Sequence, residues 1–106
     1  MGVLDPQPLG LEGAGIVEDV GSEVTGLQKG DRVFFMENGS LATSVKLSAS
    51  SCIKLPLDLS FEEAATMPCV YSTAIHCLMD LGRLREGESV LIHSACGGET
   101  PFPVTL

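Results

Sequence analysis

The sequence predicts an α+β fold because its hydrophobic pattern changes twice along the chain. Up to about residue 57, short segments of alternating apolar and polar residues are separated by glycine-containing turns, which is typical of antiparallel strands. From Leu59 onward, apolar residues recur at helical spacing. Near the carboxyl end, a nearly unbroken apolar run at residues 89–93 favours a parallel strand covered on both faces. We therefore expect a β-rich first part, then helices, then one further strand.

Short antiparallel strands account for the first part of the chain. Glycines at positions 10, 13 and 15 precede an alternating segment at residues 16–20. Glycines in this position are typical of a barrel corner or a close backbone approach, and a dinucleotide site is disfavoured there because no helix follows. The other strands are expected at residues 32–36, at residues 41–47 after an Asn38-Gly39 hairpin turn, and at residues 52–56. This pattern indicates a small barrel or sandwich.

Two helices are expected after this sheet. Ser60 and Glu63 have the spacing of a capping box, in which each side chain bonds the backbone amide of the other residue, and Pro68 is expected to stop that helix. A second helix is expected around residues 72–81, with Gly82 as its carboxyl-terminal cap.

The apolar run at residues 89–93 leads into a turn of small residues that ends in Gly97 and Gly98. Small residues after a buried strand let the backbone approach a dinucleotide pyrophosphate, and a helix amino end would then face the phosphates. Only eight residues follow Gly98, and Pro101 and Pro103 are among them. The nucleotide site therefore begins here without its helix; the alternative is a simple glycine turn.

Composition excludes several function classes. The net charge is −8 and the six basic residues are scattered, so nucleic acid and anionic membranes would be repelled. No apolar segment has membrane-span length and no secretory leader pattern is present, so a cytoplasmic location is expected. The four cysteines show no two-residue spacing, which disfavours a structural zinc site, and we expect buried free thiols.

Several blocks in order resemble one family. They are residues 10–17, 20–21, 30–33, 40–43, 59–68, 70–74 and 90–98. The set resembles the zinc-independent branch of the medium-chain dehydrogenase/reductase superfamily, and most of all the enoyl reductase domain of highly reducing polyketide synthases, with quinone oxidoreductases next. Leu11 stands where the zinc-dependent branch usually has a histidine before the glutamate matching Glu12, so the resemblance implies no catalytic zinc.

The resemblance implies hydride transfer from NADPH to an enoyl thioester carried on an acyl carrier protein. It places Tyr71 and Thr73 near the nicotinamide, and Ser94, Ala95, Gly97 and Gly98 near the cofactor diphosphate. Other roles remain open for two of these residues. Tyr71 would otherwise be a half-buried interdomain aromatic, and Thr73 a helix-start cap. No catalytic residue is assigned, and neither His76 nor His93 is expected to act in catalysis.

The resemblance also implies a domain organisation. Residues 1–66 are expected to form a partial GroES-like β-barrel, residues 67–98 to start an NAD(P)-binding Rossmann domain with its first strand, and residues 99–106 to be an unrelated tail. The chain would then be a fragment of an enoyl reductase that is inactive alone. The alternatives are a fragment of a quinone oxidoreductase-like enzyme and a barrel remnant without enzymatic activity.

Overall fold

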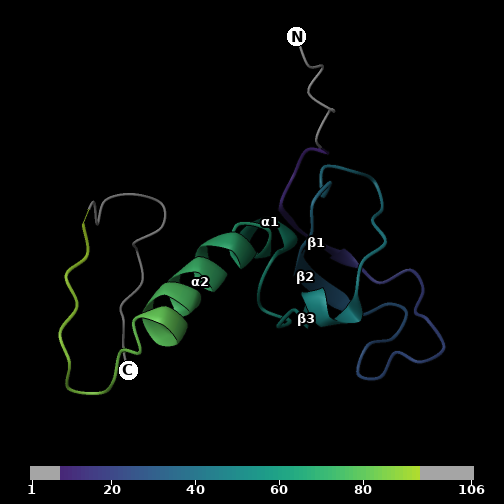
Figure 1. Cartoon of the computed structure of the whole chain (residues 1–106). Helices are drawn as coiled ribbons and strands as arrows, with labels where there is room; N and C mark the ends of the chain where they lie inside the picture. Colours follow the sequence, from purple (N-terminus) through teal and green to yellow (C-terminus); the bar gives the residue numbers. More distant parts are fainter. Residues whose placement is uncertain (1–7, 94–106) are drawn as a thin grey trace, which may run out of the picture. The chain divides into compact units, whose positions relative to one another are not determined.

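The computed structural model describes residues 8–93, which divide into two compact units between Pro68 and Cys69. In the first unit, β1 (Glu12–Ile16), β2 (Arg32–Met36) and β3 (Cys52–Lys54) form an antiparallel sheet in the order β1-β2-β3 (Figure 1). The short helix α1 (Phe61–Ala64) contacts β1. The described part of the second unit is a helix up to Leu81, followed by residues 82–93 without regular secondary structure. The α+β class is thereby confirmed.

The glycine segment itself forms the first strand, so the expectation of a strand at residues 16–20 is wrong. Gly13 lies opposite Phe35 and Gly15 lies opposite Val33. A Cβ atom at Gly13 would come within 2.9 Å of the Phe35 ring. The strand therefore uses glycine where a bulky side chain of the neighbouring strand occupies the space above the sheet.

The strand expected at residues 41–47 is absent, although the flanking strands β2 and β3 are confirmed. The central strand β2 already pairs with β1 on one side and β3 on the other, so a hairpin partner after the Asn-Gly turn has no free edge of β2 to join. The chain instead turns back toward the start of β1 and reaches β3 through a single 3₁₀ turn, η1 (Ala49–Ser51).

The Arg32 guanidinium joins the sheet to the segment that follows it. It donates hydrogen bonds to the carbonyl oxygens of Pro56 and Leu57, both at 3.3 Å, and of Leu59 at 2.6 Å. It also lies 4.6 Å from the centre of the Phe61 ring, within the range of a cation–π contact. One side chain of β2 thus fixes the path of residues 56–61.

Helix α1 begins at the predicted capping box. The Glu63 amide donates to the Ser60 hydroxyl at 3.2 Å, and the Glu63 carboxylate accepts from the Ser60 amide at 3.0 Å. Ala64 is fully buried and, with Val33, Phe35 and Leu55, makes up the buried apolar core of the described residues. The cap therefore holds Ala64 against the sheet.

The second helix starts earlier than expected, at Pro68. Helix α2 (Pro68–Ile75) continues directly into a π-helical segment, η2 (His76–Leu81), as one ribbon in Figure 1. Pro68 was expected to end a helix; it occupies the first position of one, where its missing amide is not needed. Gly82 is the cap, as predicted, but the left-handed residue is Arg83, with φ of 50°.

Gly82 packs against the helix end. Its amide donates to the Cys77 carbonyl at 2.8 Å, and a Cβ atom there would lie 2.9 Å from both the Cys77 and the Leu78 oxygens. The absent side chain lets the wide π-helical turn close on its last carbonyls.

Residues 89–93 are not a strand, contrary to the expectation. They are exposed along their length. A parallel strand requires neighbouring strands to accept and donate its backbone hydrogen bonds, and the sheet formed within residues 8–93 consists of β1, β2 and β3 alone.

We predict that Arg32→Lys destabilises the first unit by about 2 kcal/mol, because a lysine cannot reproduce the forked bonds to three carbonyl oxygens. Urea unfolding followed by circular dichroism measures the change. Arg85→Lys is the control, since Arg85 is exposed in the second unit. Equal midpoints for the two variants would show that the three carbonyl bonds contribute nothing.

We also predict that acidification weakens the first unit. Hydrogen bonds from the Ser60 amide and hydroxyl lower the pKa of Glu63 below its ordinary value of 4.5. Hydrogen bonds from Lys54 and the Gln28 amide lower the pKa of Asp31 below 3.8. Carboxylates with depressed folded-state pKa values stabilise above their unfolded pKa, and this stability is lost as pH falls through the folded value.

The unfolding free energy should therefore fall as pH drops from about 4.5. Glu63→Gln should make this fall shallower. Glu62→Gln removes a charge from the same turn without touching the capping box, so it is the matched control. If the unfolding free energy fell equally steeply with acid in wild type and in Glu63→Gln, the Glu63 carboxylate would not be a source of the acid sensitivity.

Candidate functional site

Tyr71 and Thr73, the two described residues of the expected cofactor site, both lie on α2. The Tyr71 side chain is 39% exposed. Thr73 is exposed, and its hydroxyl donates to the Cys69 carbonyl one turn earlier, at 2.7 Å. Because α2 begins at Pro68, Thr73 lies inside the helix. The alternative role of Thr73 as a helix-start cap is therefore wrong.

The spacing on α2 separates the two side chains. Residues two positions apart on an α-helix do not face each other. Tyr71 and Thr73 can each reach a ligand from the helix surface, but they would contact different groups of it. The remaining predicted residues, Ser94, Ala95, Gly97 and Gly98, lie outside the described residues.

The two histidines occupy exposed positions. His76 Nδ1 lies 3.0 Å from an Asp80 carboxylate oxygen, one turn further along η2. Both side chains are more than half exposed, so water and salt screen this pair and its contribution to stability is small. His93 is the last described residue and is exposed.

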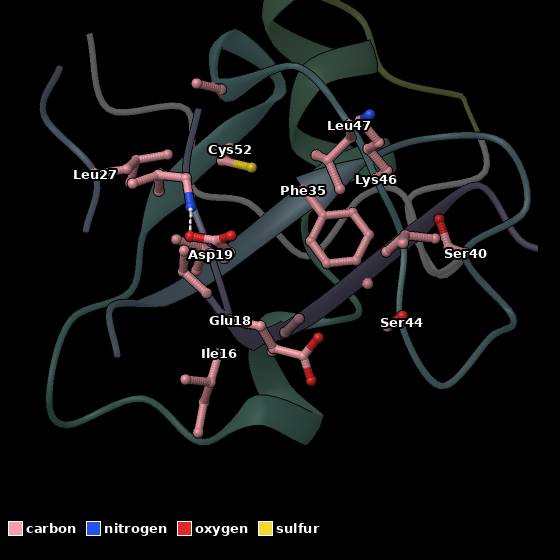
Figure 2. Close-up of a pocket in the computed structure, with 18 of the residues that line it drawn as sticks. Ile16, Glu18, Asp19, Leu27, Phe35, Ser40, Ser44, Lys46, Leu47 and Cys52 are labelled. Atoms are coloured by element: carbon pink, nitrogen blue, oxygen red, sulfur yellow. Dashed lines mark hydrogen bonds between the residues drawn. The ribbon is translucent and has the colours of Figure 1, made fainter. Parts of the chain in front are cut away.

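A hollow of about 680 Å³ opens on one face of the first unit (Figure 2). Its walls come from β1, from the loop that follows β1, and from residues 40–52. Val33 and Phe35 of β2 line it beside Gly13 and Gly15. The volume lies within the range of about 300–1,000 Å³ found for small-molecule sites.

The hollow combines an apolar floor with charged groups at its rim. Phe35 and Leu47 supply apolar surface, while Glu18 and Lys46 are exposed and carry opposite charges (Figure 2). This hollow was not predicted from the sequence. The sequence feature that could have indicated the hollow is the alternation of Gly13 and Gly15, which leaves one face of β1 without side chains. Tyr71 and Thr73, the two described residues that were expected to bind cofactor, are not among the residues that line it.

The described cysteines differ in their exposure. Cys77 is exposed and Cys52 is half-buried, so the expectation of buried thiols is wrong for Cys77. Partial burial raises the pKa of the Cys52 thiol.

Among residues 8–93, no group of three or more His, Cys, Asp or Glu side chains has the geometry to hold a metal ion. In the same range, no helix is long and apolar enough to cross a membrane.

Highly reducing polyketide synthases are similar to this chain in sequence. ALT1 of Alternaria alternata is 56% identical over 100 residues, which cover 92% of this chain and 4% of that protein. The synthase gloL of Glarea lozoyensis is 56% identical over 98 residues, with the same two coverages. The chain thus spans about 4% of the length of these relatives. The expected resemblance to highly reducing polyketide synthases is confirmed.

A solved structure and a family model define the fold family. The human synaptic vesicle membrane protein VAT-1 homolog-like protein is 43% identical and superposes with a TM-score of 0.73, over 83% of this chain and 28% of that chain. The alcohol dehydrogenase GroES-like domain model matches residues 2–57, which contain all three strands of the sheet. The chain belongs to the family of alcohol dehydrogenase GroES-like domains.

Proposed function

We propose that this chain is part of an NADPH-dependent enoyl reductase that acts on an enoyl thioester carried by an acyl carrier protein. The observation that carries the proposal is the 56% identity to the synthase ALT1 over 92% of the chain. The name of that synthase states that it is highly reducing, and an enoyl reductase performs the reduction that saturates a carbon–carbon double bond of an acyl chain. The activity is proposed for the assembled protein, of which such a chain is a small part.

We assign residues 1–66 to a partial GroES-like barrel domain, residues 67–98 to the start of a cofactor domain, and residues 99–106 to a tail outside both. The division of the described residues between Pro68 and Cys69 supports the first boundary. The family match over residues 2–57 supports the identity of the first domain.

In this proposal Tyr71 and Thr73 contact NADPH, and Ser94, Ala95, Gly97 and Gly98 approach its diphosphate. The described residues fit such a contact, since Tyr71 and Thr73 present polar groups on the exposed surface of α2. When bound, the cofactor would supply the hydride. Thr73 has a positioned hydroxyl, because its bond to the Cys69 carbonyl fixes the direction of its proton and leaves the oxygen lone pairs open to a donor.

We predict that a chimera tests the function directly. In ALT1, the stretch that matches this chain is replaced by residues 9–98. The chimera should consume NADPH with an enoyl thioester substrate, because the replaced stretch and the chain share more than half of their residues. The isolated chain, which spans about 4% of the length of ALT1, should show no turnover, because turnover requires both reactants to be held in a reactive geometry.

The unmodified ALT1 protein is the parallel control. A folded chimera that consumes NADPH with a quinone and not with the thioester would replace our assignment by a quinone oxidoreductase. A folded chimera that binds no NADPH would remove the reductase proposal altogether.

We predict that Tyr71→Phe and Thr73→Val, made in the same chimera, each weaken NADPH binding by about 1 kcal/mol, the typical contribution of one hydrogen bond. Because the two side chains do not face each other on α2, their effects should add in the double variant. Titration of NADPH fluorescence gives the dissociation constants.

Two further variants separate a ligand contact from a helix effect. Thr73→Ser keeps the hydroxyl and should retain most of the affinity. Ser72→Ala changes the exposed residue between the two and should leave affinity unchanged. A loss in Ser72→Ala as large as that in Thr73→Val would show that the variants act through the helix and not through cofactor contacts.

A further inference from the structure

The Asn38-Gly39 turn carries a reactive sequence that the proposed function does not use. Asn38 is the only asparagine of the chain and its side chain is exposed. Gly39 follows with φ of +84°, and it has no Cβ to shield its backbone nitrogen. In an Asn-Gly pair this nitrogen is the least hindered nucleophile available to the asparagine side-chain carbonyl carbon.

Three backbone hydrogen bonds hold this turn against the segment before β1. The amides of Glu37, Gly39 and Leu41 donate to the carbonyl oxygens of Leu11, Gly10 and Leu9, at 2.9, 2.9 and 3.0 Å. The nucleophilic nitrogen of Gly39 is therefore already engaged as a donor. The backbone N–H of Asn38 is also hydrogen-bonded, since it donates to the Glu37 carboxylate at 3.2 Å.

The two segments approach so closely that a side chain would not fit between them. A Cβ atom at Gly10 would lie 2.5 Å from the Leu41 nitrogen. Gly10 also has φ of +91°, so the closed turn depends on glycine at this position in both space and conformation. By contrast, Gly26 has φ of +87° and open space around it.

We propose that Asn38 is a site of spontaneous deamidation that the pairing of its turn with Leu9, Gly10 and Leu11 keeps closed. When the pairing opens, the Gly39 nitrogen loses its proton to water and attacks Cγ of Asn38. A C–N bond forms and closes a five-membered imide, while the side-chain nitrogen takes up a proton from water, its bond to Cγ breaks, and ammonia leaves. Water then adds to one of the two imide carbonyls and opens the ring to aspartate or isoaspartate. Nothing is oxidised or reduced, and water is the only co-reactant.

The isoaspartate product would prevent the turn from closing again. It places a second carboxylate beside Glu37 and makes the net charge one unit more negative than −8. Isoaspartate also adds a backbone atom to the turn, so the three bonds to residues 9–11 lose their register. A transient opening of the strand entry is thereby converted into a lasting one.

The test compares deamidation rates of the 106-residue chain at neutral pH, by intact mass and by peptide mapping for isoaspartate. The rate follows the population of the open turn when opening is fast. The folded chain should therefore deamidate more slowly than the same chain in urea. Gly10→Ala should deamidate about tenfold faster than wild type, which corresponds to about 1.4 kcal/mol of opening free energy. Gly26→Ala introduces the same backbone strain without the clash and should match wild type.

Two more variants keep the result decisive. Asn38→Gln should show no mass change, and a persistent change would place the reaction elsewhere and overturn the proposal. Leu41→Pro removes one of the three backbone donors to residues 9–11 and should accelerate deamidation less than Gly10→Ala. If Gly10→Ala does not fold, the rate of Leu41→Pro is compared with that of wild type instead. Equal rates in buffer and in urea, or no acceleration in both Gly10→Ala and Leu41→Pro, would also overturn the proposal.

Discussion

The guanidinium of Arg32 is the contact on which the first unit depends. It gathers three carbonyl oxygens of residues 56–59, which carry no regular secondary structure, and it lies over the ring of Phe61 at the start of α1. Irregular backbone close to a sheet needs donors for its carbonyl groups. A planar group with a fixed fork of donors meets this need from one position. Arg32 fixes the segment that leads into α1, and the capping box of Ser60 and Glu63 starts the helix there, so the two together bring Ala64 to its buried position.

Within residues 8–93, two surfaces that could bind a ligand lie in different units. The hollow belongs to the first unit and exists because Gly13 and Gly15 leave room beside Phe35. The surface of α2 belongs to the second unit and carries the polar groups assigned to NADPH. Glycine has another role at Gly10, where it permits the pairing that shields Asn38. Glycine thus leaves a hollow beside the sheet at Gly13 and Gly15, and allows two backbone segments to approach each other closely at Gly10.

Local signals in the sequence were sufficient for part of this structure. The strand at residues 32–36 and the capping box of Ser60 and Glu63 depend on neighbouring residues, and both are confirmed. The strands expected at residues 41–47 and 89–93 are absent, because strand formation depends on which edges are free and not on the pattern of one segment. The guanidinium contacts join residues more than twenty positions apart in the sequence, and predicting the hollow requires the pairing register of β1 and β2. Neither feature can be predicted from the pattern of a single segment.

Amide hydrogen exchange in Arg32→Met tests most directly whether one side chain couples the sheet to α1. In the wild-type chain, the Leu55 amide donates to the Arg32 carbonyl and the Ala64 amide donates to the Ser60 carbonyl. We expect both amides to lose protection together in the variant, although only the side chain at position 32 changes and neither bond involves it. Retained protection at Ala64, with loss confined to Leu55, would show that α1 is held by its cap alone and would contradict the account.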